Sequence, residues 1–229
     1  MLAIFINGLS TAAGALLGIF LGKWFEEKWE KALFSAIALV NIGIGIQGAI
    51  KTENWLLVLV SMSLGALIGT IVSLEDKMQH VGEVLKEKLH AGNDARFVDG
   101  FVTLSVLQIV GAMAILGPIQ AALVNDPSLL YLKSVLDFVS AFLFASVYGV
   151  GILPVGLVVI VYELLFYFFA SVLSPLMTPD VVRELNAVGN LLILAIGLNL
   201  LGIVKLKVAD YLPAVFIPVI YFTVLAWLS

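Results

Sequence analysis

The chain has 229 residues, of which 62% are hydrophobic and 12% charged, and its mean hydropathy is +1.12. These values lie outside the range of soluble domains and indicate an integral membrane protein. The net charge of −4 and the lack of cysteine argue against a nucleic-acid partner and exclude disulfides and cysteine-based metal sites. We therefore expect a single integral membrane domain over residues 1–229, with the lipid bilayer around it.

Apolar segments long enough to cross about 30 Å of hydrocarbon occur eight times in chain order. They are apolar on all sides, which favours helices over the alternating strands of a membrane barrel. The sequence therefore predicts an all-α, polytopic bundle of about eight transmembrane helices. The predicted spans are Leu2–Gly22, Ala32–Ile50, Trp55–Leu74, Phe101–Val124, Leu129–Leu153, Val155–Leu173, Ala187–Val204 and Tyr211–Leu228.

Basic residues are unevenly divided between the two sets of connections. With the N-terminus outside, the inner side holds nine Lys and Arg residues and the outer side three. The positive-inside rule then predicts that both termini are outside. The longest inner connection, residues 75–96, spaces its apolar residues three and four apart between charges, which predicts an amphipathic helix on the cytoplasmic surface.

The second and seventh spans resemble each other at a constant offset of 152 residues, which places Lys31 over Arg183 and Gly45 over Gly197. They are the second and the seventh of eight successive spans, an odd number of spans apart, so they cross the membrane in opposite directions. We therefore expect an inverted-topology repeat of the kind found in secondary transporters. The same offset pairs Gln47 with Asn199 and makes Asn199 a candidate binding residue.

Two stripes of small residues predict close helix packing. Gly14, Gly18 and Gly22 recur every fourth residue in the first span, and Gly65 and Gly69 do so in the third. Small residues let helix axes approach closely enough for van der Waals contacts. The partner helix lies either within the chain, which we favour, or in a second copy in a homodimer.

Two acids stand well inside the apolar spans, Asp137 and Glu163. An ionised acid at this depth costs about 3 kcal/mol, so such residues usually face a polar interior and mark an ion or proton pathway. Lys133 precedes Asp137 by one helical turn, so a purely structural ion pair is the alternative for Asp137. Ser140 shares the face of Asp137 and completes this half of a candidate binding site.

The fourth span supplies the other half of the candidate site. Ser105 and Gln108 share one of its faces. Gly117 and Pro118 predict a break in the helix, because proline removes a backbone donor and frees a carbonyl. Two neighbouring spans with polar faces and interrupted helices are typical of a transporter binding site. No catalytic motif and no set of residues typical of a metal or cofactor site occurs, so the sequence predicts neither an enzyme, a metal nor a cofactor.

Three segments, "FVDGFVTLSVLQIVGAMAILGPIQ", "KSVLDFVSAFLFAS" and "LLILAIGLNLLGIVKLKVADYLPA", resemble the bacterial YdfK/YqgA-like inner-membrane proteins, a domain-of-unknown-function family. The resemblance covers nearly the whole chain and implies a multi-pass protein of the bacterial plasma (inner) membrane. Glu163 departs from the uncharged amide expected in that family. Our hypothesis is a secondary transporter or channel for a small solute or ion, coupled to protons or sodium. The alternative is a non-transporting membrane scaffold or regulatory subunit.

Overall fold

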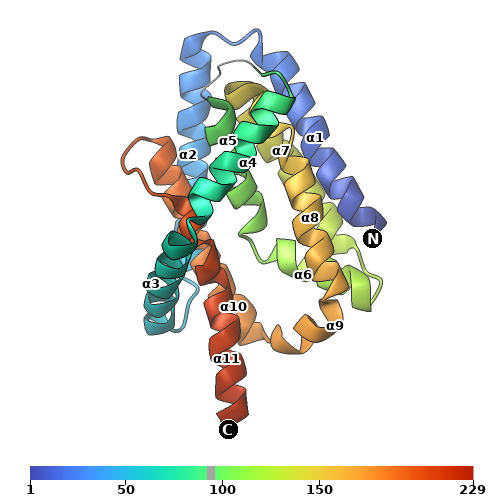
Figure 1. Ribbon diagram of the computed structural model, residues 1–229, viewed down its shortest axis with the longest axis vertical. Coiled ribbons are helices and arrows are strands. Elements are labelled where there is room, and N and C mark those ends of the chain that lie inside the picture. Colours follow the sequence, from blue (N-terminus) through green and yellow to red (C-terminus); the bar gives the residue numbers. More distant parts are fainter. Residues whose placement is uncertain (92–95, 229) are drawn as a thin grey trace.

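The computed structural model describes residues 1–91 and 96–228, and no strand occurs among them (Figure 1). The predicted all-α, polytopic bundle is confirmed. Its α-helices are α1 (Leu2–Gly22), α2 (Glu27–Ala49), α3 (Trp55–Val72), α4 (Leu74–Lys88), α5 (Arg96–Ile109), α6 (Met113–Leu123), α7 (Ser128–Tyr148), α8 (Val155–Phe168), α9 (Ala170–Leu173), α10 (Pro179–Leu200) and α11 (Ile217–Leu228). Three 3₁₀ helices join them, η1 (Gly149–Ile152), η2 (Ser174–Leu176) and η3 (Val208–Phe216).

Six helical segments of the described chain are long and apolar enough to cross a membrane, or eight if each of two bent pairs counts as one span. The bent pairs are α5 with α6, at 53°, and α8 with α9 and η2, at 65°. Large apolar side chains remain exposed along α3 and α11, including Ile71 at 81% and Trp227 at 88%. Such surfaces suit hydrocarbon, because lipid tails are as apolar as the side chains that face them.

The break in the fourth span lies at residues 110–112, not at the predicted Gly117 and Pro118. Both of these residues lie inside α6, where Pro118 is in the second turn. Pro118 lies beyond the first four donors of α6, so its missing N–H leaves the carbonyl of Ala114 without its helical hydrogen bond. The helix continues through Pro118, and the bend of the span lies before α6 begins.

The seventh span begins eight residues earlier than predicted, at Pro179 of α10. Thr178 caps this helix by accepting a hydrogen bond from the backbone N–H of Val181, and proline at the first helical position is favourable. The charges that suggested a later start have partners within α10 and in the connection between α2 and α3. Glu184 is buried, and it accepts hydrogen bonds from the Thr52 hydroxyl and from the Nε of Arg183.

Helix α4 lies within residues 75–96, the segment predicted to be an amphipathic helix, except that it begins at Leu74 and that residues 92–95 lie outside the described residues. Ser73 adopts a left-handed conformation (φ 54°) and separates it from α3. Its Gly82 packs on α5, against Phe101, so much of its inner face covers protein rather than lipid. The N-terminus of α4 is tied to η3, because the Glu75 backbone N–H donates to Asp210 at 2.8 Å.

The predicted small-residue stripes pack within the chain. Gly14, Gly18 and Gly22 place α1 against the backbone of α7, and a Cβ on Gly18 would overlap a carbonyl oxygen there. Gly65 and Gly69 of α3 lie against η3 in the same way. These glycines are thus used inside one chain, and a homodimer is not needed to explain them. Figure 1 shows α1 running beside α7 and α8.

Close contacts also establish the directions in which neighbouring helices run. Helices α1 and α7 are parallel, because successive glycines of α1 meet successive turns of α7. The pairs α1 with α8, α2 with α10 and α3 with η3 are antiparallel. Between α1 and α8, Gly8 meets Ile160 and Ala12 meets Gly156. Between α2 and α10, Gly45 meets Leu194 and Ile42 meets Gly197. Between α3 and η3, Gly65 meets Ala214 and Gly69 meets Asp210.

Candidate functional site

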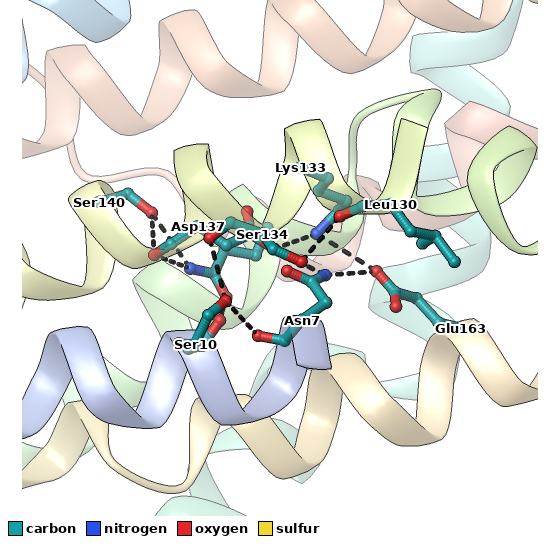
Figure 2. Close-up of polar contacts among 10 residues, drawn as sticks. Asn7, Ser10, Leu130, Lys133, Ser134, Asp137, Ser140 and Glu163 are labelled. Carbon is teal, nitrogen blue, oxygen red and sulfur yellow. Dashed lines mark hydrogen bonds and ion pairs between the residues drawn. The ribbon is translucent and has the colours of Figure 1, made fainter. Parts of the chain in front are cut away.

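Three helices bring four polar side chains together in the apolar interior, and we call this group the charge cluster. It consists of Asn7 from α1, Lys133 and Asp137 from α7, and Glu163 from α8. Each side chain belongs to a residue that is no more than 6% exposed. Figure 2 shows Asn7 between the two carboxylates, with Lys133 facing the same space.

The Asn7 amide links the two acids of the charge cluster. Its Nδ2 donates to Asp137 Oδ2 at 3.1 Å and to Glu163 Oε1 at 2.7 Å. The Lys133 ammonium forms an ion pair with Asp137 and lies 3.5 Å from Glu163 Oε1. One amide and one ammonium therefore hold two carboxylates side by side.

Close packing of α1 explains why this cluster can form. Lys133 and Asp137 are one turn apart on α7, so their side chains share a face. Gly8, next to Asn7, lies directly against α8, because a Cβ at this position would overlap Ile160. The Ser10 hydroxyl also lies between α1 and α7, and it is 3.0 Å from the carbonyl oxygen of Ser134.

The charges of the cluster do not balance. Two carboxylates face one ammonium, which leaves one excess negative charge when all three groups are ionised. In addition, Asn7 Oδ1 and Glu163 Oε2 are buried and have no hydrogen-bond partner in the described part of the chain. Buried charges and acceptors are costly unless they are paired. The cluster therefore has negative charge and free acceptors that suit a positively charged donor.

A second group of polar residues extends from the charge cluster along α5. Gln108 Nε2 donates to the Asp137 carbonyl oxygen and to Ser140 Oγ, each at 3.1 Å. Thr11 of α1 donates to Gln108 Oε1 at 3.4 Å. Ser105, one turn before Gln108, is fully buried, and its hydroxyl has no partner among residues 1–91 and 96–228.

Asn199 is the one predicted site residue that the structure places elsewhere. Its amide binds the backbone of Leu206 through two hydrogen bonds, of 2.7 and 2.9 Å. It lines a cavity of about 580 Å³ between α4, α5, α10 and the segment before η3. Tyr148 also lines this cavity, and it is eleven residues from Asp137 on α7, or about 16 Å along the helix.

The cavity carries charged groups outside the membrane spans. Glu75, from α4, accepts a hydrogen bond from the backbone N–H of Ala209 at 2.9 Å. Burial nevertheless raises the pKa of its carboxyl group above the ordinary value. Lys207 lies beside Asp76, and their hydrogen bond raises the pKa of the ammonium.

Sequence reasoning identified Asp137, Glu163, Ser140, Gln108 and Ser105, and the structure brings all five to one region. It missed Asn7 and Thr11. A faint signal existed, because these two residues are one turn apart in an otherwise apolar span and share a face. Within the described residues, no group of three or more His, Asp or Glu side chains could hold a metal ion.

The comparisons with known proteins identify relatives along nearly the whole chain. Over 222 residues the chain is 30% identical to a Bacillus subtilis (strain 168) protein called "Uncharacterized membrane protein YdfK", covering 95% of this chain and 94% of the relative. It is 30% identical over 214 residues to the Escherichia coli (strain K12) protein called "Uncharacterized protein YqgA", covering 92% and 91%. No solved structure matches. A family model described as "Protein of unknown function (DUF554)" matches residues 2–223, so the chain belongs to the DUF554 family.

Proposed function

We propose that this membrane protein is a secondary transporter or channel for a small solute or ion, coupled to protons or sodium and without enzymatic activity. The observation that carries the proposal is the charge cluster. Two carboxylates and one ammonium in an apolar interior are expensive to bury, and intramembrane charges of this kind usually lie on transport pathways. The excess negative charge matches a site that takes up and releases a cation or a proton.

The arrangement of the helices supports the proposal through an inverted repeat. Helices α1, α2 and α3 begin about 152 residues before α8, α10 and η3, respectively, and each of the three separations agrees with this offset to within one residue. Each of these three pairs is antiparallel and in direct contact. Gly8 and Ile160, which are in contact, are themselves 152 residues apart. In transporters with such repeats, the binding site lies where the repeats meet, and Asn7 is beside this crossing.

The polar residues of α5, one helix that lines the cavity and also reaches the cluster, support the proposal as well. Val102 and Val106 of α5 line the cavity near α4. Ser105 and Gln108 lie on the same helix, and Gln108 continues to Asp137. The break at residues 110–112 follows directly, and broken helices beside polar residues are typical of transporter sites.

The membrane orientation belongs to the same proposal. We place both termini outside the bacterial plasma (inner) membrane, with the cavity on the cytoplasmic side, from the distribution of Lys and Arg. The directions of the contacting helices agree with eight crossings that alternate in sense, provided that each bent pair crosses once.

The test is cation uptake into vesicles that contain the purified protein. A pH-sensitive dye inside the vesicles reports proton entry, and radioactive sodium reports sodium entry. We expect uptake of one of these cations to be faster than in protein-free vesicles and to be lost in Asp137→Asn. Glu83→Gln neutralises an exposed acid of α4 and is the matched control, which should keep wild-type uptake. Wild-type vesicles that take up neither cation faster than protein-free vesicles would overturn the proposal.

A further inference from the structure

We infer that the charge cluster is a binding site for an ammonium ion or a small primary ammonium compound, and that the Lys133 ammonium is a tethered occupant which such a cation replaces. This inference rests on the proposed function, because it names the class of solute that the transport site takes beside its coupling ion. Two observations support it: the carboxylate oxygen atoms around the Lys133 ammonium, and the buried oxygen atoms of the cluster that have no hydrogen-bond partner among the described residues.

The first argument is the match between donors and acceptors. An ammonium group has three or four N–H donors and no acceptor. Lys133 uses its donors on Asp137 and, at 3.5 Å, on Glu163. Two further buried acceptors in the cluster, Asn7 Oδ1 and Glu163 Oε2, have no partner in the part of the chain that the structure describes. A free ammonium ion has one more N–H than the lysine group and can use an acceptor that Lys133 leaves open.

The second argument concerns other cations. Calcium takes six to eight oxygen ligands, and magnesium demands an octahedral set. Asn7 presents its N–H group, not its oxygen, to both carboxylates. A metal ion between the carboxylates would meet this N–H group, whereas an ammonium donates to the same carboxylates without needing a full oxygen shell. The donor set therefore favours ammonium over a divalent metal ion.

The third argument is that Lys133 can leave. It lies in the second turn of α7, near the chain connection at residues 124–127, while Asp137 lies one turn deeper. A long lysine side chain can extend its ammonium to the membrane surface while its stem stays in apolar surroundings. Exchange with a free ammonium compound keeps the total charge of the cluster constant, and the desolvation of the incoming cation is offset by the rehydration of the Lys133 ammonium.

The experiment is a titration of purified Lys133→Ala with methylammonium chloride, read by thermal unfolding. Removing Lys133 should lower the melting temperature, and methylammonium should raise it in a saturable way, since a ligand of the folded state stabilises it. Wild-type protein should need at least about tenfold more methylammonium, because its own ammonium competes; a tenfold change in affinity corresponds to about 1.4 kcal/mol. N-methylglucamine chloride, whose cation is too bulky for this site, measures the effect of salt alone.

Two further variants make the titration specific. Lys133→Ala/Asp137→Asn lacks the main anionic partner and should lose the saturable effect. Lys205→Ala removes an exposed lysine near the distant cavity and should respond as wild type does. If Lys133→Ala does not fold, Lys133→Gln, which keeps more of the side-chain volume, is titrated in its place.

The outcomes separate this inference from the proposed function. No saturable stabilisation of the Lys133 variant, or the same stabilisation in the double variant, overturns the ammonium site, even if proton or sodium uptake is observed. Saturable binding that depends on Asp137 supports the site. If that binding occurs and the vesicles show no uptake, the ammonium site stands and the transport proposal fails.

Discussion

Neutralising Glu163 and neutralising Asp137 should have very unequal consequences for stability, although both changes remove one buried carboxylate. Glu163→Gln leaves the Lys133–Asp137 ion pair intact and removes the excess negative charge. The new amide keeps the acceptor that Asn7 uses at 2.7 Å. Burying a neutral amide costs less than burying an unpaired carboxylate. We therefore expect a free energy of unfolding within about 1 kcal/mol of wild type.

Asp137→Asn should be far more damaging. It removes the nearest partner of Lys133, and Glu163 Oε1 is then the closest carboxylate oxygen, at 3.5 Å. Breaking a buried ion pair by removing one partner typically costs about 3–5 kcal/mol, because one charge stays behind unpaired. The second carboxylate compensates in part, so we expect a loss near the lower limit, about 3 kcal/mol.

The two variants are compared by equilibrium unfolding in mixed detergent micelles, with cation uptake measured on the same preparations. Glu163→Gln should combine near-wild-type stability with lost or strongly reduced uptake, a combination that a purely structural residue would not produce. If Glu163→Gln loses as much stability as Asp137→Asn, the excess negative charge does not exist in the folded protein. Our account of the cluster would then be refuted.

Three further predictions concern packing, topology and pH. Gly18→Val should cost at least about 2 kcal/mol of unfolding free energy, because its Cβ would overlap the α7 backbone, whereas Gly43→Ala, with nothing within 4 Å, should be neutral or stabilising. Lys51→Cys and Lys88→Cys should be labelled by a membrane-impermeant reagent from opposite sides, and labelling from the same side would contradict the topology. Burial raises the pKa of Glu75 above 4.5, so its folded state binds the proton more tightly and the resulting stability is lost as pH rises through the folded pKa. Glu75→Gln should flatten the dependence of the melting temperature on pH. An unchanged slope would show that another group causes this pH dependence.

The amino-acid sequence by itself determined the solvent, the helical class and most of the spans. Continuous apolar segments can satisfy their backbone groups in lipid only as helices, so composition and length suffice for this part. It also singled out Asp137 and Glu163, because a charge inside an apolar segment is visible without any knowledge of its neighbours. The start of α10 was missed, since Arg183 and Glu184 looked like a connection and each has a partner far away in the sequence, Glu53 for Arg183 and Thr52 for Glu184.

Only the tertiary structure decided which helices meet at the cluster. Asn7 is an ordinary polar residue in the sequence, and it becomes the link between two acids because Gly8 and Gly14 let α1 approach α8 and α7. Asn199 passed the same sequence test and lies at the cavity between α4, α5 and α10, where it binds the backbone of Leu206. The physical reason is that hydrogen bonds and ion pairs act over about 3 Å, and residues 130 or more positions apart reach that distance only through helix packing.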